Sequence, residues 1–186
     1  MVALALLETD ATTACWAGGN HNLGVVYLTM LSKAQATNPS EILDSAYSCF
    51  KNALTVRTTS NSPFDWAMPQ DCLGVTLQKI GDISVGSDKS NYFDRSEACH
   101  NLALTIFSEH QHPINWEMTQ NNLGNLYVSQ GQLMRPTEAA KKYRAAIDLF
   151  NRALAQQKNS GMVHAQEMTM ANLNHVQSLL DQNSVN

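Results

Sequence analysis

The chain has 186 residues, of which 12 are Lys or Arg and 16 are Asp or Glu, for a formal net charge of −4 at pH 7. Charged residues make up 15% of the sequence, against about 25% in a typical soluble domain, while 17 Asn and 12 Gln predict a polar but nearly neutral surface. This balance argues against nucleic acid as a partner, and no apolar run reaches the roughly 18 to 20 residues of a membrane span.

Apolar periodicity predicts helices near residues 12–33, 39–59, 64–80, 91–110, 115–130, 137–157 and 162–182. Residues 1–8 are interpreted as the end of a helix whose start is missing. The Gly- and Ser-containing stretch 81–90 is predicted to be a flexible loop between helices. Pro69 is expected either to shift the start of its helix or to bend the first turn.

The sequence repeats itself every 50 residues. Residues 66–74 and 116–124 align without a gap and share five of nine identities, namely Trp, Met, Gln, Leu and Gly. Trp16 and the pair Leu23-Gly24 fall in the same columns one repeat earlier, and Glu167-Met168-Thr169 falls in them one repeat later. Four copies that stay in register over this length indicate an array of structural repeats.

The sequence carries a signature-like block at Asn122-Leu123-Gly124-Asn125-Leu126-Tyr127, followed by an Ala-rich helix that ends in Phe150-Asn151-Arg152-Ala153-Leu154. This combination resembles the tetratricopeptide repeat (TPR) family. The family's usual repeat has about 34 residues. The longer period here is similar to the extended variety of bacterial multi-repeat regulatory proteins and to the kinesin light chain type. The resemblance covers nearly the whole chain, and it implies a fold without fixing a ligand.

The resemblance implies an all-α fold, a right-handed helical-repeat solenoid of antiparallel helix pairs with about four repeats and about seven or eight helices. We expect residues 1–186 to form a single TPR-like repeat domain. The expected repeat phases are about 1–33, 34–82, 83–132 and 133–186. The N-terminal end is apolar where an array needs a polar cap, which predicts self-association through that end or a chain that is part of a longer protein.

Most of the recurring residues are expected to pack. Gly24, Gly74 and Gly124 lie inside predicted helices, where Gly costs about 1 kcal/mol relative to Ala, so close approach of a neighbouring helix is the expected compensation. The recurring Trp residues at 16, 66 and 116 are expected to be wedged between helix pairs, with a ligand cage as the alternative. The Met column at 68, 118 and 168 is expected to fill the core, with an adaptable binding face as the alternative.

In the TPR family the first helix of each pair lines the concave face. The position two before the recurring glycine holds Asn in three of four copies, with Cys72 as the exception. An amide offers one acceptor and two donors, so a ladder of Asn could hold a peptide of any sequence. Capping of loops or internal bridging between repeats is the alternative. The candidate peptide-binding residues are His21, Asn22, Asp71, Asn121, Asn122, Asn125, Asn172 and His175.

The sequence contains no phosphate-binding glycine loop, nucleophile elbow or HExxH motif. His110 and His112 are two residues apart and would diverge on a helix, so no metal site is expected. Four cysteines without a CxxC pair or a secretory signal indicate free thiols in a reducing compartment. We therefore expect a cytoplasmic protein that is not an enzyme and needs no cofactor or metal.

The predicted function is that of a protein- or peptide-binding scaffold or adaptor that uses the concave groove of a TPR-like solenoid. The expected partner is a protein or an extended peptide, and neither nucleic acid nor membrane. Few cations lie on the predicted first helices, so capture of a peptide's C-terminal carboxylate is not expected. The alternative is a peptide- or small-ligand-sensing regulatory repeat domain, as a protein of its own or as a fragment of a larger signalling protein.

Overall fold

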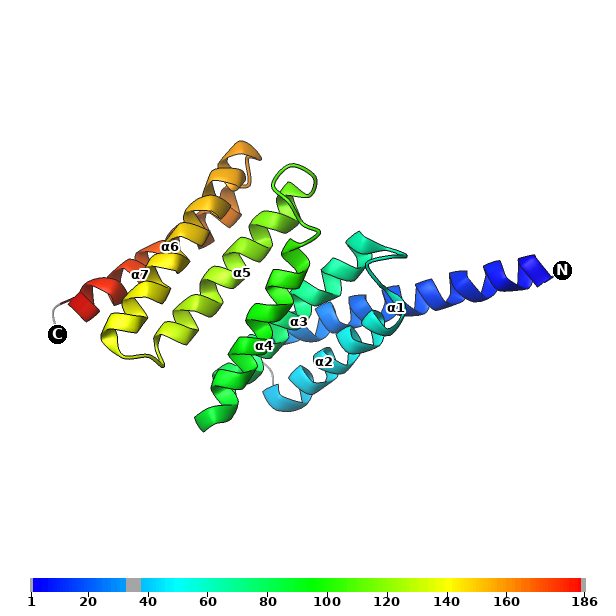
Figure 1. The fold of residues 1–186 in the computed structure, drawn as a ribbon, viewed down its shortest axis with the longest axis horizontal. Coiled ribbons are helices and arrows are strands. Elements are labelled where there is room, and N and C mark those ends of the chain that lie inside the picture. The colour runs from blue at the N-terminus through cyan, green and yellow to red at the C-terminus, as the bar shows by residue number, and fades with distance from the viewer. Residues whose placement is uncertain (1, 33–37, 185–186) are drawn as a thin grey trace. The chain divides into compact units, whose positions relative to one another are not determined.

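The computed structural model describes residues 2–32 and 38–184, and all regular secondary structure within these ranges is α-helical. Side chains are described for residues 13–31 and 38–183. The helices, labelled in Figure 1, are α1 (Val2–Ser32), α2 (Pro39–Val56), α3 (Pro63–Ile83), α4 (Gly86–Leu104), α5 (Pro113–Gly131), α6 (Pro136–Asn159) and α7 (Val163–Ser184). The prediction of an all-α chain is confirmed.

The chain divides into two compact units, residues 1–106 (unit 1) and residues 107–186 (unit 2). In unit 1, consecutive helices from α1 to α4 pack against one another, and α1 also touches α3. In unit 2, α6 packs against both α5 and α7, and α5 and α7 meet directly. Within each unit the consecutive helices run antiparallel (Figure 1).

Proline sets the start of four helices. Pro39, Pro63, Pro113 and Pro136 each occupy the first helical positions of α2, α3, α5 and α6. A proline at this point sacrifices no hydrogen bond, because the first N–H groups of a helix have no partner within it, and its fixed φ suits the helix. Pro69 lies inside α3 and is buried. It does not shift the helix start, since α3 begins at Pro63, in the same repeat column as Pro113.

The two helices of each pair meet where a glycine faces a ring. A Cβ built on Gly24 would lie 2.7 Å from Cε1 of Phe50, and one on Gly124 would lie 2.6 Å from Cε1 of Phe150. In the middle copy the same position, Gly74, would bring a Cβ within 2.6 Å of His100. The predicted close approach is therefore confirmed in all three copies.

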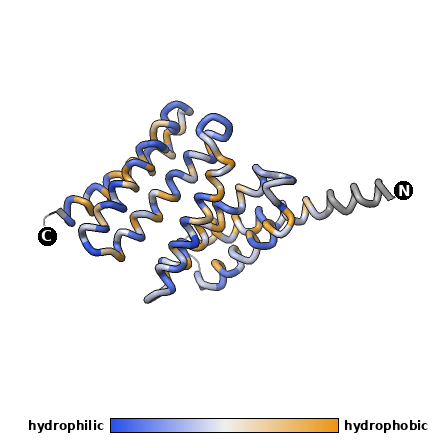
Figure 2. The backbone as a smooth tube through the Cα atoms, in the orientation of Figure 1, coloured by the Kyte–Doolittle hydropathy of each residue, from blue (hydrophilic) through white to orange (hydrophobic). Residues whose placement is uncertain are grey.

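The core of each unit is built around these rings. In unit 1, Phe50 clusters with Ala46, Leu73, Leu77 and Cys99. In unit 2, the buried cluster consists of Val128, Ala139, Tyr143, Ala146, Phe150 and Val176. Figure 2 shows apolar and polar residues alternating along the helices, as expected when one face of each helix is buried and the other meets solvent.

Several predicted helix boundaries are wrong. Residues 2–32 form one continuous helix, so residues 1–8 do not end a separate one. The predicted loop 81–90 is mostly helical, because α3 runs to Ile83 and α4 begins at Gly86. Gly81 is packed against Phe93, with 2.6 Å left for a Cβ, and it does not break the helix. The polar first turns of α4 are largely exposed, so their composition reflects contact with solvent rather than a loop.

The fourth predicted helix also extends too far at its C-terminal end. The prediction was 91–110, whereas α4 ends at Leu104 and Thr105 forms its C-terminal cap. His110 and His112 therefore lie in the connection to α5, and His112 immediately precedes that helix. The ring of His112 packs at 5.9 Å from that of Phe107.

The tryptophan column does not behave uniformly. Trp116 is 6% exposed, and the guanidinium of Arg152 lies 5.0 Å from its ring centre. Trp16 is 48% exposed, so its predicted wedging between helix pairs is wrong. The counterpart of Arg152 beside Trp16 is Asn52, whose short amide instead donates to Asn20 Oδ1 at 3.2 Å. The apolar N-terminal end proposed for self-association, residues 2–7, lies outside the described side chains.

Replacing Gly24 by Ala is expected to destabilise the protein by about 1–3 kcal/mol, because the added methyl group collides with the buried ring of Phe50. The matched control is Gly19→Ala in the same helix, where a Cβ meets nothing within 4 Å. The control is expected to gain up to about 1 kcal/mol. Equilibrium denaturation followed by circular dichroism measures both, and equal effects would contradict the close contact.

Candidate functional site

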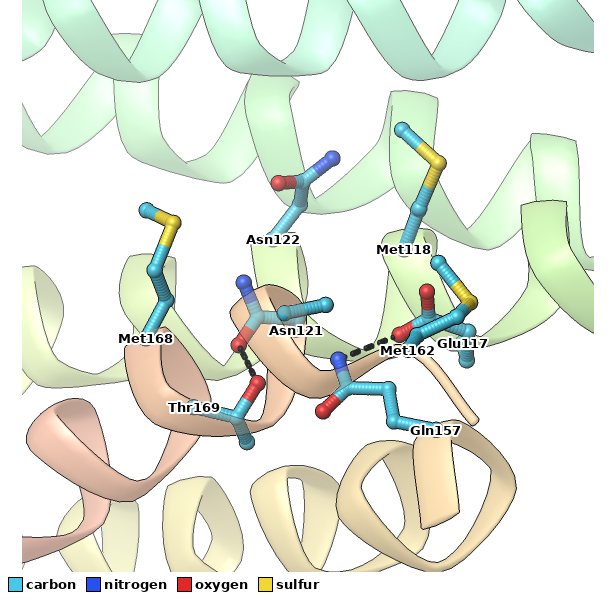
Figure 3. Close-up of a pocket in the computed structure, with 9 residues that line it drawn as sticks. Glu117, Met118, Asn121, Asn122, Gln157, Met162, Met168 and Thr169 are labelled. Atoms are coloured by element: carbon cyan, nitrogen blue, oxygen red, sulfur yellow. Dashed lines mark hydrogen bonds between the residues drawn. The ribbon is translucent and has the colours of Figure 1, made fainter. Parts of the chain in front are cut away.

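Unit 2 contains a cavity of about 260 Å³ between α5, the end of α6 and the start of α7 (Figure 3). The residues that line the cavity follow the spacing of an α-helix. On α5 the lining residues are one and four positions apart, and on α7 they are three and four apart, so each set occupies one face of its helix. The lining residues are Glu117, Met118, Asn121, Asn122, Gln157, Met162, Ala165, Met168 and Thr169.

A buried carboxyl–amide pair forms the polar part of the cavity. Glu117 is 1% exposed and Gln157 is 2% exposed. The Nε2 of Gln157 donates to Oε2 of Glu117 at 2.7 Å, as Figure 3 shows. The Gln157 Oε1 is buried and accepts no hydrogen bond from any described residue. The pair thus leaves one buried acceptor unsatisfied, which is costly for a buried polar atom.

Burial raises the pKa of Glu117 above its ordinary value, and the hydrogen bond from Gln157 opposes that shift. Desolvation disfavours the ionised carboxylate, whereas a donor that faces it favours ionisation. A hydrogen bond also joins the end of α6 to the start of α7, because Gln166 Nε2 donates to the backbone carbonyl of Gln157 at 3.2 Å. The carboxyl group is therefore held in a fixed position.

Methionines form the apolar part of the cavity. Met118 is 50% exposed and Met168 is 58% exposed, and Met162 is half-buried. The prediction that the Met column fills the core is wrong for Met118 and Met168. The core-facing position of α5 is the next one, Thr119, which is fully buried, and one helical step turns Met118 away from it by about 100°. The adaptable binding face is the alternative that matches these exposures.

The predicted Asn residues of unit 2 meet at this site, with different roles. Asn121 and Asn122 both line the cavity. The Oδ1 of Asn121 accepts from Thr169 Oγ1 at 3.3 Å and from Asn172 Nδ2 at 3.5 Å, so Asn121 and Asn172 bridge α5 and α7. Asn125 is half-buried one turn further along α5 and does not line the cavity.

His175 is exposed on α7, outside the residues that line the cavity. The candidates in unit 1 are placed differently. Asn22 is exposed, whereas His21 is buried with its ring 5.8 Å from that of Phe50. Burial lowers the pKa of His21, and the Arg57 guanidinium lowers it further. His21 is a core residue of its helix pair.

Asp71 is buried and forms an internal pair. Its Oδ1 lies 2.7 Å from Nδ1 of His100, which is fully buried in α4. The other ring nitrogen of His100, Nε2, has no partner in the described structure. In the first and third copies the ring position holds Phe50 and Phe150, so this polar pair is particular to the middle copy. Asp71 therefore joins α3 to α4 within unit 1.

Unit 1 has a cavity of about 370 Å³ at the equivalent turn between repeats. Arg57 lines it and stands in the repeat column of Gln157. The guanidinium donates to the backbone carbonyl of Asp65 at 3.3 Å and lies 3.9 Å from its carboxylate. The column of Glu117 holds Ala17 here. Unit 1 thus supplies its own cation at this place, and unit 2 instead places a carboxyl group there.

The cysteines and histidines form no ligand cluster. All four cysteines are free, and no group of three or more His, Cys, Asp or Glu among residues with described positions could hold a metal ion. Burial and the Asp71 carboxylate raise the pKa of Cys72 to about 12, and burial raises that of Cys99 to about 11. Neither thiol is ionised near neutral pH, so neither is activated as a nucleophile.

Sequence reasoning missed Glu117, Gln157 and Met162. The repeat alignment did contain a signal for Glu117, because its column holds Ala17 and Ala67 in the two earlier copies.

Searches of protein-family models and of curated proteins found nothing that matches the chain. Among the helices described, none is long and apolar enough to cross a membrane.

Thiol labelling of the native protein is expected to modify Cys15 rapidly, because it is exposed, and the other cysteines slowly, because they are wholly or largely buried. Ellman's reagent followed over time measures the two phases. The control variant Cys15→Ser should lose the fast phase and keep the slow one. A fast phase that survives in the variant would contradict the placement of the remaining thiols.

The raised pKa of Glu117 predicts a pH-dependent stability. The native state holds this proton more tightly than the unfolded chain, so the stabilising contribution is present below the ordinary pKa of 4.5 and is lost as pH rises through the raised pKa. The free energy of unfolding of the wild type, relative to Glu117→Gln, should therefore fall over that range. The matched control is Glu167→Gln, which makes the same substitution at the exposed glutamate of the next copy.

Proposed function

We propose that the chain is a protein- or peptide-binding repeat domain, a right-handed TPR-like solenoid of helix pairs that acts as a scaffold or adaptor in the cytoplasm. The 50-residue repeat and the recurring glycine–ring contact support this architecture. The observation that carries the proposal is the unit 2 cavity, where exposed methionines surround buried polar groups. Binding sites for extended chains combine such an adaptable apolar surface with fixed hydrogen-bonding groups.

The partner in this proposal is an extended peptide segment that places one side chain in the cavity. A volume of about 260 Å³ lies below the roughly 300–1,000 Å³ of typical small-molecule sites. That size favours insertion of a single side chain over enclosure of a whole ligand. Asn122 lines the cavity and offers amide donors and an acceptor to the peptide backbone. The alternative, a regulatory domain that senses a small ligand, would require the cavity to enlarge on binding.

The test is selection of linear peptides from a phage-displayed library against the wild type, followed by affinity measurements on variants. Met168→Ala is expected to weaken the selected peptides by about three- to tenfold, because a partly buried apolar contact is lost. The matched control is Met170→Ala on the same helix, which is 51% exposed and does not line the cavity.

Peptides that bind the Met168 variant as tightly as the wild type would place the binding surface elsewhere. A selection that yields no peptides, combined with saturable binding of a small molecule, would instead favour the sensing alternative. Circular dichroism of both variants controls for folding.

A further inference from the structure

The orientation of the Gln157 amide follows from the charge of its neighbour. A carboxylate only accepts hydrogen bonds, so the ionised Glu117 requires the amide nitrogen of Gln157 to face it. Figure 3 shows that nitrogen directed at Glu117 and the amide oxygen turned away from it. In this orientation, Gln157 Oε1 accepts no hydrogen bond from any of the described groups. The pair therefore holds a carboxylate, which only accepts hydrogen bonds, beside the cavity.

Charge in the cavity is not balanced from within. Glu117 is the one ionisable residue among those that line it. On α7, the nearest charged groups in sequence are Glu167 and His164, which are both exposed and lie 3.7 Å from each other. On α6, Lys158 follows Gln157 but is exposed and does not line the cavity. A buried carboxylate without a cation is costly, and an entering cation would remove that cost.

We propose that the unit 2 cavity recognises a basic side chain, Lys or Arg, of the bound peptide. Its N–H groups donate to the Glu117 carboxylate, which lines the cavity. Its methylene stem packs against the methionines at 118, 162 and 168, as long cationic side chains do on apolar surfaces. This inference rests on the proposed function and adds the chemical identity of the residue that enters the cavity.

Unit 1 supports this assignment from within the same chain. Its equivalent cavity is lined by a basic side chain of the protein itself, Arg57, paired with Asp65. The Arg57 Nη2 lies 3.5 Å from a Cβ built on Gly18, which occupies the repeat column of Met118. In unit 2 the corresponding position is the neutral Gln157, and the carboxyl group comes from α5. The Arg57 guanidinium therefore lines the unit 1 cavity, and the residues that line the unit 2 cavity include no cation.

The experiment uses the full chain with ¹³C-labelled methionine methyl groups, titrated with Nα-acetyl-lysine methylamide. The matched probe is Nα-acetyl-norleucine methylamide, which keeps the stem and lacks the charge. The lysine probe is expected to shift the methyl signals of Met118, Met162 and Met168 and to leave that of Met170 in place. Its affinity should exceed that of norleucine by about tenfold or more, the contribution of a hydrogen bond to a charged group.

Glu117→Gln is expected to remove the preference for lysine while norleucine binds as before, and Glu167→Gln should change neither. Lowering the pH through the raised pKa of Glu117 should weaken lysine binding in the wild type alone. If the Glu117 variant does not fold, the pH titration of the wild type with both probes carries the test, because protonation of Glu117 removes its charge without a substitution.

Equal affinity for the two probes, or shifts confined to other methionines, would overturn the inference. If n-butylamine binds as tightly as the lysine probe, the site takes a free amine and the peptide source is wrong. Failure of this inference is distinct from failure of the proposed function. Library peptides that depend on Met168 but show no preference for a basic residue would leave the function standing and reject the basic anchor.

Discussion

The helix pairs of this protein depend on the contact between a glycine of one helix and a ring of the next. With only 2.6–2.7 Å available for a Cβ at Gly24, Gly74 and Gly124, no other residue permits the same approach. Glycine inside a helix costs about 1 kcal/mol, whereas full burial of a Phe side chain gains about 1.5–3 kcal/mol. The exchange is favourable in the first and third pairs, and in the middle pair the ring is that of His100. The positions of the cavity residues follow from it, because the approach of α5 and α6 fixes where Glu117 and Gln157 meet.

Much of the fold could be predicted because the copies of the repeat can be aligned with one another. The glycine contact was inferred from three copies in one column, and the prolines marked helix starts. Composition failed where polar residues lie on an exposed helix, as in the first turns of α4. Periodicity failed for Met118 and Met168, because neighbouring positions on a helix point about 100° apart and the column one step away is the buried one. Trp16 is exposed although it shares a column with the buried Trp116, and the column of Arg152, which packs on Trp116, holds Asn52 in the first copy.

The candidate site was harder to predict, since its main residues are defined by differences between copies. Asn122 follows from the recurring Asn column and Asn121 is its neighbour in the sequence, and both line the cavity. Glu117 and Gln157 stand 40 residues apart and meet only after α5 and α6 have packed. The column of Gln157 holds Leu, Arg and Phe in the other copies, and that of Glu117 holds Ala in the two earlier copies and the exposed Glu167 in the last, so averaging over repeats conceals the pair. In a repeat protein the recurring residues report the architecture, and the exceptions indicate where chemistry is local.

The buried pair of Asp71 and His100 has a consequence for assembly. A chain whose helices share a repeated pattern can pair them wrongly while it folds, because each second helix can meet several similar first helices. A Phe ring set against Asp71 would bury a carboxylate without the imidazole, which costs several kcal/mol. His100 set against His21 or Asn121 would lose the carboxylate. The Asp71–His100 pair thus disfavours the pairing of α3 or α4 with helices of the other copies. This departure from the repeat therefore favours the native order of the helices.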